Sequence, residues 1–209
     1  ELAALGATDY NYGIAQDAQG RIWAANERPM LVYDGARWLA LRDATDRTGS
    51  HTPLPRGSRV YGSAASELGY FEADRAGVFQ WHGLNAQLPA DARQFGRVTG
   101  PVATTDAVWY LTTSHIVRFG DDGSVQLQPA DGYEPELSAF DDAVFVVDPA
   151  RGLLQARHDG RGIVLEAPAG LDESWRAQLG TPARGADGAR IYQAQSHALL
   201  RAAGSADPE

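Results

Sequence analysis

Arginine is the residue type in this sequence that is best placed to bind a ligand. Arg59, Arg97 and Arg184 lie in segments that we expect to be the first, innermost strands of repeated sheets, and Tyr12 lies in another such segment. A guanidinium group stays charged and donates several hydrogen bonds in one plane, which suits carboxylates and phosphates. The pattern therefore predicts an arginine-lined channel that binds an anionic ligand.

Two connections between the expected sheets add further candidate ligand contacts. Residues 42–58 (RDATDRTGSHTPLPRGS) are long and polar, and Arg47, His51 and Arg56 could contact a ligand from there. Long loops on a rigid scaffold often carry binding residues, although a solvated insertion is the alternative. A later connection contains Trp175, which we expect on a short helix as an aromatic platform or, alternatively, packed on the sheets.

The composition excludes several kinds of chemistry. The 209 residues include neither cysteine nor lysine, so thiolate metal sites, thiol nucleophiles, Schiff-base lysines and P-loops are ruled out. A formal net charge of −9 argues against nucleic acid as a partner, because such binding needs a basic surface. The five histidines are scattered without a metal-binding spacing. We therefore expect no metal and no cofactor.

Repeated short apolar runs separated by turn signals indicate an all-β protein. The clearest unit, residues 12–41, contains four such runs, and Asp34-Gly35 between two of them is a strong hairpin signal. Similar units follow, each with an aromatic residue that we expect on its second strand, 36 to 48 residues apart: Trp23, Phe71, Trp109, Phe145 and Tyr192. This period predicts a single β-propeller domain, residues 1–209, of about five four-stranded antiparallel blades.

The fifth unit lacks an outermost strand. Residues 1–5 (ELAAL) precede the first full unit and could supply that strand, which would close the ring and protect an open sheet edge. The alternative is that the chain is a segment of a larger propeller. The sequence alone leaves both arrangements open, together with the oligomeric state.

Residues 14–35 (IAQDAQGRIWAANERPMLVYDG) resemble the blade repeat of the two-component regulator propeller family. The matching positions are Asp17, Gly20, Ile22, Trp23, Tyr33, Asp34 and Gly35, while Ala24-Ala25 replaces the usual Gly-Thr. The resemblance implies an extracytoplasmic or periplasmic sensor of a bacterial membrane signalling protein. It also implies an output domain, such as a histidine kinase or a cyclic-dinucleotide enzyme, beyond a transmembrane helix.

Three functions follow as hypotheses. The first is a non-enzymatic sensor that binds an unidentified small molecule or protein and changes the balance between two signalling states. The second is a five-bladed glycoside hydrolase or lyase, which would need facing carboxylates on the innermost strands. The acidic pairs Asp121-Asp122 and Asp141-Asp142 fall instead in expected turns. The third is a protein-interaction scaffold.

Overall fold

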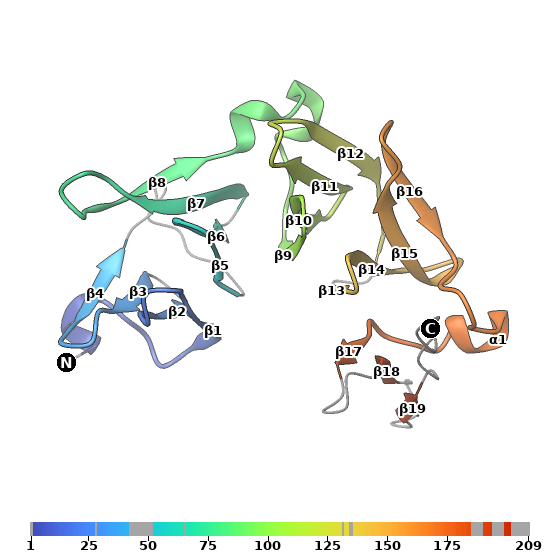
Figure 1. The fold of residues 1–209 in the computed structure, drawn as a ribbon, viewed down its shortest axis with the longest axis horizontal. Helices are drawn as coiled ribbons and strands as arrows, with labels where there is room; N and C mark the ends of the chain where they lie inside the picture. The colour runs from blue at the N-terminus through green and yellow to red at the C-terminus, as the bar shows by residue number, and fades with distance from the viewer. Residues whose placement is uncertain are drawn as a thin grey trace, which may run out of the picture. The chain divides into compact units, whose positions relative to one another are not determined.

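The computed structural model describes residues 2–27, 29–41, 52–64, 66–130, 132–133, 136–184, 190–193 and 199–201. These residues form antiparallel sheets in which each strand pairs with the next along the chain (Figure 1). The first sheet comprises β1 (Asn11–Gln16), β2 (Ile22–Asn26), β3 (Met30–Tyr33) and β4 (Trp38–Leu41). The second comprises β5 (Leu54–Arg56), β6 (Arg59–Ala64), β7 (Glu67–Ala73) and β8 (Phe79–Gly83).

The later sheets repeat this arrangement. The third comprises β9 (Val98–Thr104), β10 (Ala107–Thr112), β11 (His115–Gly120) and β12 (Val125–Pro129). The fourth comprises β13 (Leu137–Phe140), β14 (Ala143–Asp148), β15 (Gly152–His158) and β16 (Ile163–Glu166). The described strands of the fifth are β17 (Ala183–Arg184), β18 (Arg190–Gln193) and β19 (Leu199–Arg201). The predicted fold of four-stranded antiparallel propeller blades is confirmed.

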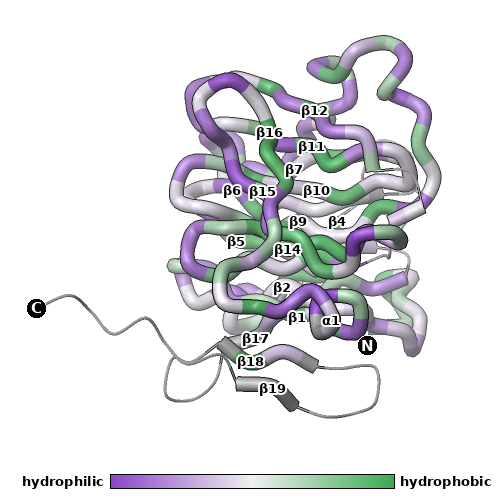
Figure 2. Tube along the Cα trace, turned by 90° about the vertical axis from the view of Figure 1, so that its right-hand side faces the viewer, coloured by the Kyte–Doolittle hydropathy of each residue, from purple (hydrophilic) through white to green (hydrophobic). Residues whose placement is uncertain are grey.

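The chain divides into two compact units, Glu1–Pro101 and Val102–Glu209. In unit 1, Trp23 and Val32 of the first sheet pack against Val60 and Phe71 of the second. In unit 2, one cluster joins the third and fourth sheets, and another, which includes Tyr192, joins the fourth and fifth. Within each unit the sheets therefore stack face to face, and hydrophobic residues concentrate in strands rather than in the turns (Figure 2).

Aspartates shape the turns between strands. Asp17 Oδ1 accepts hydrogen bonds from the backbone N–H groups of Gln19 and Arg21, at 3.0 Å each. Gly20, at the end of this turn, has φ +82°, a conformation that glycine adopts without strain. The side chains of Asp34, Asp74, Asp122 and Asp159 accept from backbone N–H groups of their own turns in the same way. These carboxylates are turn formers, as expected for Asp122.

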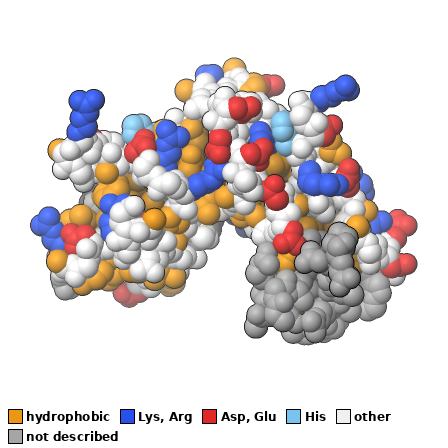
Figure 3. Space-filling view, viewed as in Figure 1, with side chains coloured by type: hydrophobic (Ala, Val, Ile, Leu, Met, Phe, Trp, Pro, Cys, Tyr) orange, Lys and Arg blue, Asp and Glu red, His pale blue; other side chains and the backbone are white. Residues whose placement is uncertain are grey.

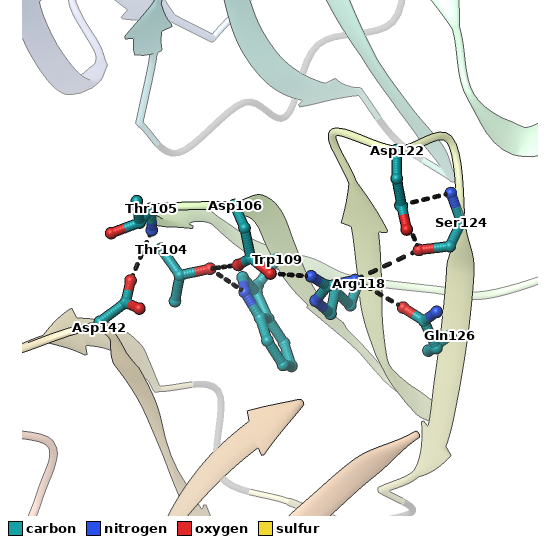
Figure 4. Close-up of polar contacts among 9 residues, drawn as sticks. All are labelled: Thr104, Thr105, Asp106, Trp109, Arg118, Asp122, Ser124, Gln126 and Asp142. Atoms are coloured by element: carbon teal, nitrogen blue, oxygen red, sulfur yellow. Dashed lines mark hydrogen bonds and ion pairs between the residues drawn. The ribbon is translucent and has the colours of Figure 1, made fainter. Parts of the chain in front are cut away.

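A polar network around the buried side chains of Trp109, Thr104 and Arg118 links the strands and turns of the third sheet (Figure 4). The Trp109 indole donates to Thr104 Oγ1 at 2.9 Å, and that hydroxyl donates to Asp106. Arg118, 2% exposed, donates to Asp106 and to Gln126 Oε1, the latter at 2.9 Å. The neighbouring turn of the fourth sheet contributes Asp142, which accepts from the Thr105 N–H. The arginine is thus held by structural partners.

The expected strand at residues 1–5 is wrong. Leu2–Leu5 form a 3₁₀ helix, η1, beside β4, and the N–H groups of Gly6 and Ala7 close it by donating to Ala3 and Leu2. Leucine and alanine favour helical backbone, and Gly6, at φ +81°, ends the turn. In the described part of the chain, no helix has the length and apolar character needed to cross a membrane.

The strand order of the second sheet also differs from the prediction. Leu54–Arg56 form the first strand, so Arg59–Ala64 form the second and Phe71 lies on the third, β7. The aromatic residue of the second strand is Tyr61. The sequence gives no clear strand signal for β5, because this strand is three residues long and contains Pro55, and proline disfavours strands. Residues 84–88 (LNAQL), an apolar run that reads as the fourth strand, contain instead a 3₁₀ helix, η2 (Asn85–Gln87).

Candidate ligand-binding site

The structure brings two of the predicted arginines together. Arg56 at the end of β5 and Arg59 at the start of β6 are direct cross-strand partners, joined by a turn in which Gly57 has φ +61°. Residues that are directly opposite in an antiparallel pair project from the same face of the sheet. Two guanidinium groups therefore belong to one face of the second sheet, where Arg56 is half-buried and Arg59 is exposed.

Cross-strand register adds aromatic and acidic residues to this face. Arg59 pairs with Glu72, Tyr61 with Tyr70, and Tyr70 with His82. We call this set the Arg–Tyr cluster: Arg56, Arg59, Tyr61, Tyr70, Glu72 and His82. Figure 3 shows basic, acidic and histidine side chains gathered over the region of β7 and β8. The apolar residues that alternate with them, Val60 and Phe71, pack on the first sheet instead.

Arg59 is fixed by three neighbours. Its guanidinium carbon lies 4.4 Å from the centre of the Tyr70 ring, and its Nε lies 3.5 Å from Glu72 Oε1. A hydrogen bond to Tyr61 raises the pKa of Arg59, against a smaller opposing effect of burial. The side chain is still 44% exposed. A cation held by an aromatic face and an ion pair, yet open to solvent, is prepositioned for an incoming anion.

The rest of the cluster forms a stacked surface. The Tyr70 and His82 rings stack with centroids 5.1 Å apart and planes at 18°, and the Tyr61 ring lies 5.3 Å from Tyr70. Ser58 donates a 2.7 Å hydrogen bond to Glu72, which, with the nearby Arg59, lowers the pKa of that carboxyl. Glu72 is therefore an anion at neutral pH, and it forms an ion pair with Arg59.

The other predicted site residues lie elsewhere or outside the described part. Tyr12 is 45% exposed on β1, and Arg97 is exposed just before β9. Arg184 lies in β17, in unit 2, and its side chain is not described. The helix that carries Trp175, α1 (Glu173–Arg176), is confirmed, but this side chain is also not described. Arg47 and His51 lie outside the described residues.

The expectation that Arg59 lies on an innermost strand is wrong, because β6 is the second strand of its sheet. Sequence reasoning also missed four members of the cluster, namely Tyr61, Tyr70, Glu72 and His82. The alternation in residues 67–73 (ELGYFEA) places Tyr70 and Glu72 on one face, and this signal was available. His82 lies in β8, where register brings it to Tyr70.

A second charged cluster lies in unit 2. Arg151 donates to Asp148 Oδ2 through Nε at 3.0 Å and Nη2 at 2.8 Å, and Nη2 also donates to the Tyr133 hydroxyl at 2.9 Å. Burial alone would raise the pKa of Asp148, but hydrogen bonds from Arg151 and Ala150 lower it to about 2. These contacts hold the turn between β14 and β15. Among the described residues, no group of acidic and histidine side chains could hold a metal ion.

Comparison with solved structures places the fold among β-propellers. The extracellular domains of two B. thetaiotaomicron proteins described as hybrid two-component systems superpose with TM-scores of 0.61 and 0.63, at 13% and 10% sequence identity. The matches cover 92% and 95% of this chain but only 30% and 28% of those chains. The chain therefore spans less than a third of their length. The resemblance seen in residues 14–35 is confirmed at the level of the fold.

The same fold also occurs in an enzyme. A luciferin-regenerating enzyme superposes with a TM-score of 0.57 at 13% identity, over 96% of this chain and 74% of that one. The fold alone therefore does not separate a sensor from an enzyme. No protein-family model matches the sequence, and a search of curated proteins also gave no match.

Proposed function

We propose that this chain is the ligand-binding part of an extracytoplasmic sensor in a bacterial membrane signalling protein, and that it carries out no catalysis. Its ligand is a small anion that binds at the Arg–Tyr cluster. A signalling output domain in the same protein receives the signal that ligand binding produces. The observation that carries the proposal is Arg59, a solvent-accessible cation already oriented by Tyr70 and Glu72.

The chemistry of the cluster supports an anionic ligand. Arg59 offers a guanidinium group that is 44% exposed beside Glu72, and Arg56 lies directly across from it in the strand register. A carboxylate or phosphate would pair with the guanidinium groups, and a flat part of the ligand would lie against the Tyr70–His82 stack. The similarity to the extracellular domains of two-component systems supports the sensor role and the extracytoplasmic location.

The placement of the acids supports the absence of catalysis. The described first strands β1, β5, β9, β13 and β17 contain neither aspartate nor glutamate. A glycoside hydrolase needs a carboxylic acid with a raised pKa facing a second carboxylate. The shifted carboxyl pKa values of the described residues are instead lowered, by turn N–H groups as at Asp34 or by arginine as at Asp148.

A ligand-observed NMR experiment tests binding and turnover together. The chain is mixed with a panel of small mono- and dicarboxylates, sugar acids and sugar phosphates, and the ligand spectra are followed over hours. We expect line broadening for at least one anion, its loss in Arg59→Gln, and no new product signals. Product signals would show that the protein is an enzyme and would contradict the sensor proposal. If no anion showed broadening, the proposal of an anionic ligand would be wrong.

A further inference from the structure

The second sheet carries three glycines in direct cross-strand register on the face that packs on the first sheet. Gly62, Gly69 and Gly83 lie side by side in β6, β7 and β8. Phe71 and Trp81 belong to the same face and pack with the first sheet. Because side chains alternate along a strand, this is the opposite face from the Arg–Tyr cluster. The three glycines contribute no side chains of their own to this part of the face.

Two long side chains from neighbouring positions lie over these glycines. A β-carbon at Gly69 would clash with the Trp81 ring, so that ring lies against the strand backbone. A β-carbon at Gly83 would lie 2.6 Å from Oε1 of Glu67 and 3.9 Å from Nε1 of Trp81. The carboxyl group and the indole N–H therefore approach the same place, beside Gly83. Glu67 and Trp81 are half-buried and Gly83 is exposed, so this place lies where the interface between the sheets meets solvent.

Each of the two side chains has a buried polar atom that is left unpaired. Oε2 of Glu67 and Nε1 of Trp81 are closed to solvent, and neither has a hydrogen-bond partner among the described residues. The indoles of Trp23 and Trp109, in contrast, donate to side chains of their own sheets. Native proteins pair nearly all buried polar groups, with protein or with an enclosed water molecule, because an unpaired group is costly. An unpaired donor and an unpaired acceptor in one place therefore indicate a shared partner.

The two atoms together define the chemistry of that partner, which must donate to Oε2 of Glu67 and accept from the indole N–H of Trp81. An ammonium group cannot accept, an ionised carboxylate cannot donate, and a metal ion can do neither, whereas a hydroxyl group does both through one oxygen. We propose that Glu67 and Trp81 form a second binding site in unit 1, which binds a hydroxyl group of a water molecule or of a small polyol. This site is separate from the Arg–Tyr cluster, because it lies on the other face of the second sheet.

Nuclear magnetic resonance of the indole N–H groups tests the site directly. The five tryptophans give five indole signals in a proton–nitrogen correlation spectrum, and Trp81→Phe identifies the signal of Trp81. We expect the Trp81 indole proton of the wild-type chain to show a through-space contact with a bound water molecule, or its signal to shift when glycerol or glucose is added. A water contact that persists without a shift identifies water as the occupant, and a shift identifies the polyol. The absence of both would overturn the proposal.

Glu67→Met tests the acceptor, because methionine has a similar length and no carboxylate. This variant should lose the water contact or the polyol shift at Trp81, while unchanged indole signals of Trp23 and Trp109 show that it folds. Glu166→Met is the matched control, because Glu166 is 48% exposed on β16 in unit 2, and it should leave the Trp81 signal and its contact unchanged. A Glu67→Met variant that folds and keeps the contact or the shift would overturn the proposal. So would a Glu166→Met variant that loses it equally.

Discussion

The indole N–H of Trp23 donates to Oδ2 of Asp17 over 2.8 Å, in a part of the first sheet that is closed to water. Burial alone would raise the pKa of Asp17, but this bond and those from Arg21 lower it. One carboxylate therefore holds the turn, an arginine and the buried tryptophan together. In the third sheet the corresponding indole, Trp109, donates instead to a neutral hydroxyl, that of Thr104.

The difference between the two acceptors predicts that replacing each tryptophan lowers the free energy of unfolding by a different amount. Trp23→Phe and Trp109→Phe remove similar volumes and one hydrogen bond each. A hydrogen bond to a charged group contributes about 1.5–3 kcal/mol, and one between neutral groups about 0.5–1.5. Trp23→Phe should therefore lower the free energy of unfolding by about 1 kcal/mol more than Trp109→Phe. Urea unfolding of both variants measures this, and equal losses would contradict the role assigned to Asp17.

Asp148 makes the stability of unit 2 depend on pH. Its folded-state pKa, about 2, lies below the ordinary value of 3.8, so its ionised form favours folding above pH 4. This contribution, about 2 kcal/mol from the size of the shift, is lost as the pH falls toward 2. Asp148→Asn should thus be about 2 kcal/mol less stable than wild type at pH 7.

The same comparison as a function of pH provides the control. The gap in unfolding free energy between wild type and Asp148→Asn should narrow from pH 4 downward and nearly close by pH 2. If the gap stayed constant over this range, the variant would lose stability because the amide fits the site poorly, not because it lacks the charge. That result would contradict the ion pair with Arg151 as the cause of the loss.

Gly152 is required by the close approach of α1. A β-carbon there would lie 2.3 Å from the backbone oxygen of Arg176, and φ is +71°. Gly152→Ala should therefore cost about 3 kcal/mol or more, because both backbones must move. Gly160→Ala has φ +89° but no atom within 4 Å of the new carbon, so it should cost only about 1 kcal/mol of backbone strain. Thermal or urea unfolding of the two variants separates the effects.

The fold was predictable where turn signals and alternation agree. Asp34-Gly35 and the Asp17–Gly20 turn bound strands that the structure contains, because these residues form the turns through their own side chains and backbone. The prediction failed at Leu54–Arg56, where a three-residue strand with Pro55 has no periodicity to detect, and every later strand of that sheet shifted by one position.

The candidate site was predictable only in part. Arg56 and Arg59 were selected for their charge, and both belong to the Arg–Tyr cluster. Their partners Tyr70 and His82 come from strands whose register depends on pairing along the whole sheet, so residue type and spacing could not find them. Arg97 and Arg184 were chosen by repeat position; Arg97 is exposed just before β9, and the side chain of Arg184 is not described.

Calorimetric titration with an anion that binds in the ligand panel is the most direct test of the sensor proposal. Arg59→Gln should weaken binding by at least about tenfold, or about 1.4 kcal/mol. Arg37→Gln is the matched control in the same unit, because Arg37 is 73% exposed and lies 3.7 Å from Asp34 in a surface ion pair of little energetic weight. We expect loss of affinity in Arg59→Gln alone. Equal affinity of wild type and Arg59→Gln would contradict it.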